Sequence, residues 1–317
     1  MTENKLPVSE YTKNIMNQLR QVVVGKDQVL LWVFATILAK GHILLEDIPG
    51  VGKTTMALGF SKTLDLECSR VQFTPDVLPS DVTGYTVLQQ GSGEMVYQKG
   101  AVLCNLFLAD ELNRATSRTQ SALLEAMEEG QVTVDGVSHP IPKPFTVIAT
   151  QNPTGAAGTQ LLPDSPMDRF MIRLSMGYPS PADEFAMVQS RQSGNPLDSL
   201  APIMTRDTLM ALQETVAQTY AKETVVHYIV SLITATRKNE HILRGASPRA
   251  TLAVTAMSKA LAQLQGRDYV IPGDVQAVFP YVIPHRILMT PTAQSRGITA
   301  KQVVDTILRS TPAPSMY

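Results

Sequence analysis

The chain predicts an α/β fold with a mainly parallel five-stranded sheet, followed by an all-α domain. Over the first 180 residues, short apolar runs alternate with helical patterns, as in parallel strands that are joined by helices. The segment 178–181 contains two prolines that break this pattern, and beyond it the apolar spacing is helical throughout. We therefore expect an α/β domain over residues 1–180 and a helical domain over residues 181–317.

The expected elements follow in chain order. Two helices, over residues 9–22 and 26–40, precede the first strand. The five strands of the sheet are predicted over residues 42–46, 70–73, 106–110, 145–150 and 171–176. Two hairpins are inserted between them, over residues 85–98 and over residues 131–141, the second around the turn Asp135-Gly136. Further helices are predicted over residues 54–64, 247–264, 273–282 and 299–309, with apolar helix faces at 209–220 and 225–233.

Composition narrows the class of protein. With 44% hydrophobic and 17% charged residues the chain is expected to fold, and no apolar run reaches the roughly 18 residues of a membrane span. Residues 1–180 hold 14 Lys and Arg against 18 Asp and Glu, and residues 181–317 hold 13 against 10, so nucleic acid is not the expected partner. Cys68 and Cys104 are expected to be reduced core thiols of a cytoplasmic protein. The five histidines lack the spacing of a transition-metal site.

A phosphate loop is the first functional motif. A Gly-Lys-Thr triplet, with a further glycine two residues before it, lies between an apolar strand and a helix. Backbone amides at the helix N-terminus can therefore converge on a phosphate group. Lys53 is expected to contact the β- and γ-phosphates of ATP, and the Thr54 hydroxyl to hold Mg²⁺. The general pattern places glycine where this chain has Asp47, which we expect at the exit of the strand. The nucleotide-binding residues predicted here are Asp47, Ile48, Pro49, Gly50, Val51, Gly52, Lys53, Thr54 and Thr55.

Polar side chains also end two other strands. Asp110 and Glu111 close an apolar strand at the carboxyl edge of the sheet, where ligands of α/β proteins bind. We expect Asp110 to complete the Mg²⁺ site and Glu111 to orient or deprotonate the attacking water. Asn152 follows the next buried strand and could hold the γ-phosphate and the water in line. Asparagine before proline is also a routine turn residue.

Two arginines complete the expected catalytic set. Ser247 and Pro248 place Arg249 in the first turn of a helix, where a cation opposes the helix dipole, so we expect it to bind an anion such as a nucleotide phosphate. A salt bridge to a nearby acid is the alternative. Arg169 precedes the last strand and could reach the γ-phosphate of a neighbouring subunit. By itself, the triplet 168–170 would equally form an ion pair at the edge of the core.

Taken together, these motifs resemble the MoxR group of the AAA+ ATPases, and the resemblance covers nearly the whole chain. The segments that carry it are 23–25, 45–54, 109–115, 150–153, 162–164, 168–170, 247–249, 282–286 and 312–314. Asp47, a departure from the general phosphate loop, is usual in this group. The resemblance implies that Asn152 is the first sensor, Arg249 the second sensor and Arg169 the arginine finger. It also implies that Val24 and Gly25 line the adenine pocket.

The same resemblance implies a P-loop AAA+ core with a helical lid and assembly into homo-oligomeric rings, commonly hexamers. It further implies a chaperone-like role in maturing or remodelling other proteins, beside a partner with a von Willebrand factor A domain. A nucleic-acid motor is the alternative, because related AAA+ proteins with the same two hairpins include helicases. A magnesium-chelatase-like motor subunit would differ only in its partner, and a nucleotide-dependent scaffold would lack turnover. The client protein is not specified by the sequence.

Overall fold

The computed structural model describes residues 7–48, 50–91, 93–152, 162, 164–192 and 194–315. At its centre is a sheet of five strands in the order β2-β5-β8-β1-β9, and all neighbouring pairs in it are parallel. The strands are β1 (Ile43–Glu46), β2 (Cys68–Gln72), β5 (Leu106–Asp110), β8 (Thr146–Gln151) and β9 (Ile172–Leu174). The predicted parallel five-stranded sheet is therefore confirmed.

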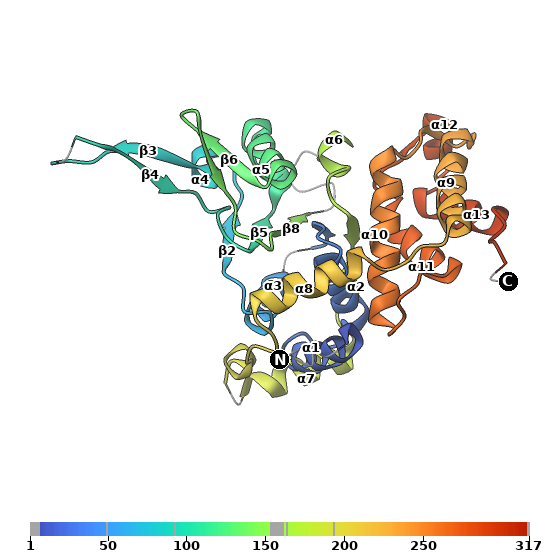
Figure 1. Ribbon diagram of the computed structural model, residues 1–317, viewed down its shortest axis with the longest axis horizontal. Helices are drawn as coiled ribbons and strands as arrows, with labels where there is room; N and C mark the ends of the chain where they lie inside the picture. Colours follow the sequence, from blue (N-terminus) through green and yellow to red (C-terminus); the bar gives the residue numbers. More distant parts are fainter. Residues whose placement is uncertain are drawn as a thin grey trace.

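Helices cover both faces of this sheet (Figure 1). One face is covered by α1 (Val8–Val22), α2 (Asp27–Leu38) and α3 (Lys53–Thr63), and the other by α4 (Pro79–Thr83) and α5 (Ser117–Glu129). In strand β5, alternate side chains point to opposite faces of the sheet. Leu106 and Leu108 pack with the first group of helices, whereas Phe107 and Ala109 pack with the second. Because both faces are buried, the strand is a continuous apolar run.

Two antiparallel hairpins extend from the α/β body, as predicted. The first joins β3 (Gly84–Leu88) to β4 (Met95–Lys99) and projects away from the rest of the molecule (Figure 1). The second joins β6 (Gln131–Val134) to β7 (Val137–Pro140). The rings of Tyr97 and His139 stack with their centroids 3.6 Å apart, so the two hairpins contact each other.

The second half of the chain is helical, with one addition to the prediction. Its main elements are α7 (Pro181–Gln192), α8 (Arg206–Ala217), α9 (Glu223–Lys238), α10 (Pro248–Leu264), α11 (Pro272–Val282), α12 (Pro291–Ser295) and α13 (Ala300–Ser310). Strands β10 (Ile242–Arg244) and β11 (Leu288–Met289) form a small antiparallel sheet, which is too short to show a strand period in the sequence. Helix α10 packs on α1 and α2, so one apolar core runs through both halves.

The remaining short elements connect these parts. They are η1 (Leu112–Arg114), α6 (Asp164–Met167) and η2 (Pro196–Ser199). The predicted domain boundary at residue 180 falls in the segment without regular secondary structure between β9 and α7. Among the described residues, none of the helices combines the length and the apolar character needed to cross a membrane.

Candidate functional site

The phosphate loop joins β1 to α3 at the carboxyl edge of the sheet. Gly52 is the N-cap of α3 and has a φ of 94°, in the left-handed region where a side chain would be strained. Lys53 and Thr54 then open the helix, so the unpaired N–H groups of its first turn face the loop. The local geometry is the one that the glycines of the motif predict.

The Lys53 side chain is buried at the base of this loop, with 6% of its surface exposed. Its Nζ donates a hydrogen bond to the carbonyl oxygen of Asp47 at 3.1 Å. Burial lowers the pKa of Lys53, and the charges of Asp110, Asp47 and Glu111 oppose that shift. These three acids offset part of the cost of burying an ammonium group.

Asp47 ties the loop to the end of β9. Its carboxylate accepts hydrogen bonds from the Ser175 hydroxyl at 2.8 Å, from the Gly177 N–H at 3.0 Å and from the Met176 N–H. The side chain therefore acts at the strand exit, and neither Asp47 nor Ile48 is part of the cavity wall described next. Pro49, which was also expected to bind nucleotide, lies outside the described residues.

A cavity of about 690 Å³ opens beside the loop. The predicted residues in its wall are Val24, Gly50, Val51, Gly52, Lys53, Thr54, Thr55, Asp110 and Glu111. Gly25 supports the wall without being part of it. Its φ is 71°, and a Cβ atom there would lie 2.3 Å from the carboxyl group of Asp183. The turn after Val24 thus packs against the start of α7 with no room for a side chain.

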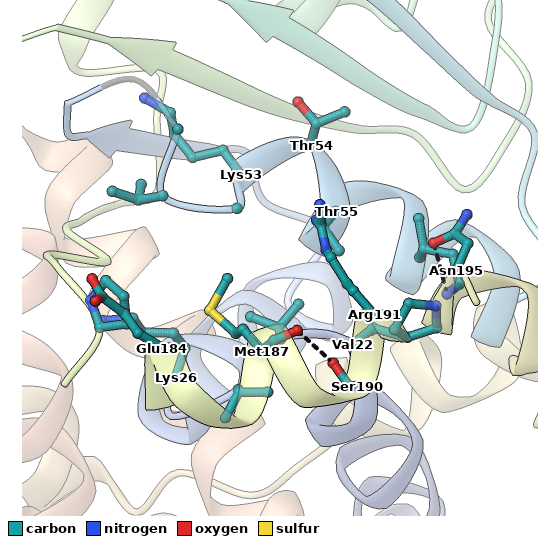
Figure 2. Close-up of a pocket in the computed structure, with 18 of the residues that line it drawn as sticks. Val22, Lys26, Lys53, Thr54, Thr55, Glu184, Met187, Ser190, Arg191 and Asn195 are labelled. Atoms are coloured by element: carbon teal, nitrogen blue, oxygen red, sulfur yellow. Dashed lines mark hydrogen bonds between the residues drawn. The ribbon is translucent and has the colours of Figure 1, made fainter. Parts of the chain in front are cut away.

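Helix α7 forms the opposite wall, a contribution that the sequence analysis missed. Glu184, Met187 and Arg191 lie on the helix face that is turned toward the phosphate loop (Figure 2). Their spacing marks one helix face and was visible in the sequence. Residues 181–192 were assigned to the helical second domain without a helix of their own, however, and nothing in the sequence joined them to the loop. Arg70 and Gln72 of β2 also line the cavity and were likewise missed.

Asp110 is fixed by a cation and a hydroxyl group. One carboxylate oxygen accepts from Arg70 Nη2 at 2.8 Å, and the other accepts from Thr150 Oγ1 at 2.7 Å. The Thr150 hydroxyl also accepts a hydrogen bond from the Glu111 N–H at 2.8 Å. Thr150 therefore joins the two predicted acids, although a single hydroxyl at the end of an apolar run gave no sign of this role.

Glu111 and Asn152, which were predicted to lie at the same edge of the sheet, are in direct contact. Asn152 Nδ2 donates to one carboxylate oxygen of Glu111 at 3.0 Å, and Arg114 Nη1 pairs with the other at 2.8 Å. The hydrogen bond from Arg114 is the main cause that lowers the pKa of Glu111, and the bond from Asn152 adds to it. Glu111 is thus ionised and oriented at the edge of the cavity.

The two predicted arginines lie elsewhere, and the described residues that line the cavity do not include them. Arg169 Nη2 pairs with Glu128 at 2.8 Å, and Arg249 Nη2 pairs with the other carboxylate oxygen of the same residue. Arg249 was expected to bind a nucleotide phosphate, with a salt bridge to a nearby acid as the alternative, and within one subunit the structure shows the salt bridge. Within one subunit, neither guanidinium group reaches the nucleotide cavity.

Three of the segments that carry the family resemblance meet at the junction between the two halves of the chain, namely 168–170, 247–249 and 282–286. The Asp168 carboxylate accepts from the Ser247 hydroxyl at 2.8 Å and from Arg286 at 2.7 Å. Arg286 and His285 also donate to the Phe170 carbonyl oxygen, at 2.7 and 2.9 Å. Burial is the main reason that the pKa of His285 lies well below its usual value, so its ring is neutral here.

The cavity has the donors that a magnesium nucleotide needs. The Thr54 hydroxyl and the Asp110 carboxylate are the hard oxygen ligands that Mg²⁺ prefers, and bound phosphates usually complete its shell. Val22, Val24 and Met187 supply apolar surface for a base. In the described part of the chain, the buried Oδ1 of Asn152 has no hydrogen-bond partner.

Comparison with known proteins agrees with this geometry. The family described as "ATPase family associated with various cellular activities (AAA)" matches residues 42–172. The AAA lid domain matches residues 234–307. The first match contains four strands of the sheet and the start of the fifth, the phosphate loop and both acids, and the second contains α10 with Arg249.

Similar proteins cover almost the full chain. The protein YeaC of Bacillus subtilis, whose function is uncharacterised, is 42% identical over 94% of this chain and 93% of its own length. The Mycobacterium tuberculosis protein named Chaperone MoxR1 is 39% identical over 94% of this chain and 81% of its own. A crystal structure of a candidate ATPase from Cytophaga hutchinsonii superposes with a TM-score of 0.91 at 35% identity, covering 97% of this chain and 96% of that one. The chain belongs to the MoxR family of AAA+ ATPases.

Proposed function

We propose that this chain hydrolyses ATP in a ring of identical subunits and uses the cycle to remodel or mature partner proteins. The observation that carries the proposal is the separation of the catalytic groups. Lys53, Asp110 and Glu111 surround one cavity, whereas Arg169 and Arg249 lie outside it on a shared acid. A site that is complete only between two subunits explains why the lysine and the acids surround the cavity while the arginines lie outside it.

Each residue around the cavity has a defined role in this proposal. Lys53 binds the β- and γ-phosphates, and Thr54 and Asp110 hold Mg²⁺, which neutralises charge on the phosphate oxygens when it is bound. Glu111 accepts a hydrogen bond from the attacking water and orients it. Asn152 fixes Glu111 through its amide N–H.

The arginines are proposed to act on the nucleotide of the neighbouring subunit. Their side chains are partly exposed, 25% for Arg169 and 49% for Arg249, so a neighbour can reach them. An arginine supplied in trans stabilises the charge that develops on the transferred phosphoryl group. Rings require such heterologous contacts, in which different faces of the same subunit meet. A hexamer is the assembly that the family resemblance favours.

The remodelling role rests on the relative named as a chaperone and on the hairpins. The first hairpin exposes the apolar side chains of Tyr85, Leu88 and Met95 among polar ones, and Val137 is exposed on the second. Apolar hairpin surfaces suit contact with polypeptide better than contact with a phosphate backbone. A cytoplasmic location and a partner with a von Willebrand factor A domain complete the proposal. A pull-down with Glu111→Gln protein in ATP identifies the partner.

Two variants test hydrolysis between subunits. Glu111→Gln should bind ATP and lose most hydrolysis, and Arg169→Ala should lose turnover without weaker ATP binding to a single subunit. In an equal mixture, a site with intact Glu111 meets a neighbour with intact Arg169 in about one case in four, so about a quarter of the native turnover should return. Native turnover in Glu111→Gln, or no recovery at any mixing ratio, would contradict the proposal.

A further inference from the structure

We propose that Glu128 is a positioning residue for catalysis in the neighbouring subunit, because it gathers Arg169 and Arg249 into one oriented pair. This inference rests on the proposed function, in which both arginines act in trans. Glu128 itself touches neither the cavity nor the nucleotide bound there. Its effect is carried entirely by the two guanidinium groups.

The geometry brings three separate segments to one carboxylate. Glu128 lies in the last turn of α5, Arg169 follows α6, and Arg249 is in the first turn of α10. Arg169 donates to Oε2 through Nε at 2.9 Å and through Nη2 at 2.8 Å. Arg249 Nη2 contacts Oε1. Each oxygen of the carboxylate therefore holds one arginine, and the two guanidinium groups are kept close together.

Local helix stability does not explain this arrangement. The last turn of a helix disfavours an acid, and the first turn disfavours a cation. Glu128 and Arg249 each stand against the dipole of their own helix, and the pairing compensates both. Ion pairs at this exposure add little net stability. The more important effect of Glu128 is that it holds two like charges side by side, an arrangement that mutual repulsion would otherwise disfavour.

A neighbouring hydrogen bond holds together the two segments that carry Arg169 and Arg249, but it does not involve their guanidinium groups. Asp168 binds Ser247, and these residues stand one and two positions before Arg169 and Arg249. With the backbone fixed, the direction of the two long side chains depends on Glu128. The hydrogen bond from Arg169 is the main cause that holds the pKa of Glu128 below its usual value. Glu128 therefore stays ionised in neutral buffers.

The chain offers a matched control on the same helix. Glu125 lies one turn before Glu128, is exposed, and lines the same surface groove as Glu128 and Arg169. It forms no ion pair with either arginine. Glu125→Gln and Glu128→Gln therefore remove the same charge from the same surface, and only the second releases the arginines.

The first test compares ATP turnover of these two variants. Glu128→Gln should reduce turnover about tenfold, a fraction of what an arginine finger contributes, and Glu125→Gln should retain native turnover. Glu128→Asp keeps the charge but not the reach, so it should fall between the two. ATP binding to the dilute single subunit should be native in all three. Turnover of Glu128→Gln within twofold of Glu125→Gln would overturn the proposal.

Mixing then locates the defect. Glu128→Gln mixed equally with Glu111→Gln should regain about a quarter of native turnover, because sites with intact Glu111 then meet neighbours with an intact arginine pair. Glu128→Gln mixed with Arg169→Ala should regain nothing, since both defects lie on the same side of the interface. If Arg169→Ala recovers with Glu111→Gln but Glu128→Gln does not, the role of Glu128 is refuted and the proposed function stands. If neither recovers, the proposed function itself fails.

A melting temperature separates positioning from folding. Glu128→Gln should melt within about 2 °C of Glu125→Gln, because an exposed pair contributes little to stability. A much lower melting temperature, with lost turnover that no mixture restores, would show that Glu128 holds the fold and would overturn the positioning role.

Discussion

Asp47 stands where the general phosphate loop has glycine. Replacing it tests whether its carboxylate holds the loop to the end of β9. In Asp47→Ala, the hydroxyl of Ser175 and the N–H groups of Met176 and Gly177 lose their acceptor. A hydrogen bond to a charged group contributes about 1.5–3 kcal/mol. Removing a carboxylate that is only 5% exposed also relieves a desolvation penalty of several kcal/mol. We expect a net loss of about 2–4 kcal/mol in the free energy of unfolding.

The variants form a graded series. Asp47→Asn can keep the bonds to one oxygen, but its amide N–H₂ would face the Met176 N–H, so it should be less destabilised than Asp47→Ala. Asp47→Gly restores the general motif and should nevertheless melt as low as alanine, because glycine also lacks the acceptor. For a chain of this size, the loss corresponds to a melting temperature lower by about 3–6 °C in thermal denaturation followed by circular dichroism.

Nucleotide binding supplies the second measurement. Lys53 binds the carbonyl oxygen of residue 47, which every variant keeps, so ATP affinity measured well below the melting temperature should fall less than about tenfold. Asp47→Gly that melts at the native temperature, or above it, would refute the reasoning. The side chain would then be a neutral replacement and not a tie between the loop and β9.

Three further predictions concern single side chains. Thr150→Val removes the hydroxyl between Asp110 and the Glu111 N–H, so turnover should fall at least about tenfold, and Thr150→Ser should restore most of it. Arg70→Gln frees one oxygen of Asp110, so the Mg²⁺ concentration for half-maximal turnover should fall about two- to fivefold, and an unchanged value would contradict competition between Arg70 and the metal. Burial lowers the pKa of His42 to about 4, whereas the unfolded chain binds this proton near pH 6.5. The free energy of unfolding should therefore reach its full value above pH 6.5 and fall by about 3 kcal/mol as the pH drops to 4. When unfolding by urea is measured over this pH range, His42→Gln should show a smaller fall.

The sequence could predict the sheet and the groups at its edge because both follow from local patterns. Buried strands are continuous apolar runs, and the carboxyl ends of parallel strands meet at one edge. That reasoning was enough to bring Asp110, Glu111 and Asn152 together. It could not supply Thr150, because its role depends on the register between β5 and β8, which sets a hydroxyl opposite two acids.

The partners of the arginines were beyond such reasoning for a different reason. Helical spacing says which side chains share a face but not which distant segment that face meets. Arg249 was expected to bind an anion because it opposes its helix dipole, and its acceptor proved to be Glu128, from a helix in the other half of the chain. The wall formed by α7 was missed likewise, because it depends on how the chain folds back after β9.

The junction at Asp168 links the two nucleotides that each subunit would contact. Asp168 ties the loop before β9 to Ser247 and Arg286, so the position of α10 on the core decides how far Arg249 stands from Arg169. At the other side, α7 begins the helical half and lines the cavity of its own subunit. If both arginines serve the neighbour, a shift of the helical half caused by one nucleotide must change the arginine pair presented to the next. By linkage, any coupling that this shift creates acts in the other direction with equal energy, from the neighbour's triphosphate on the nucleotide of the first subunit. A ring built this way passes nucleotide state from subunit to subunit without a separate transmitting element.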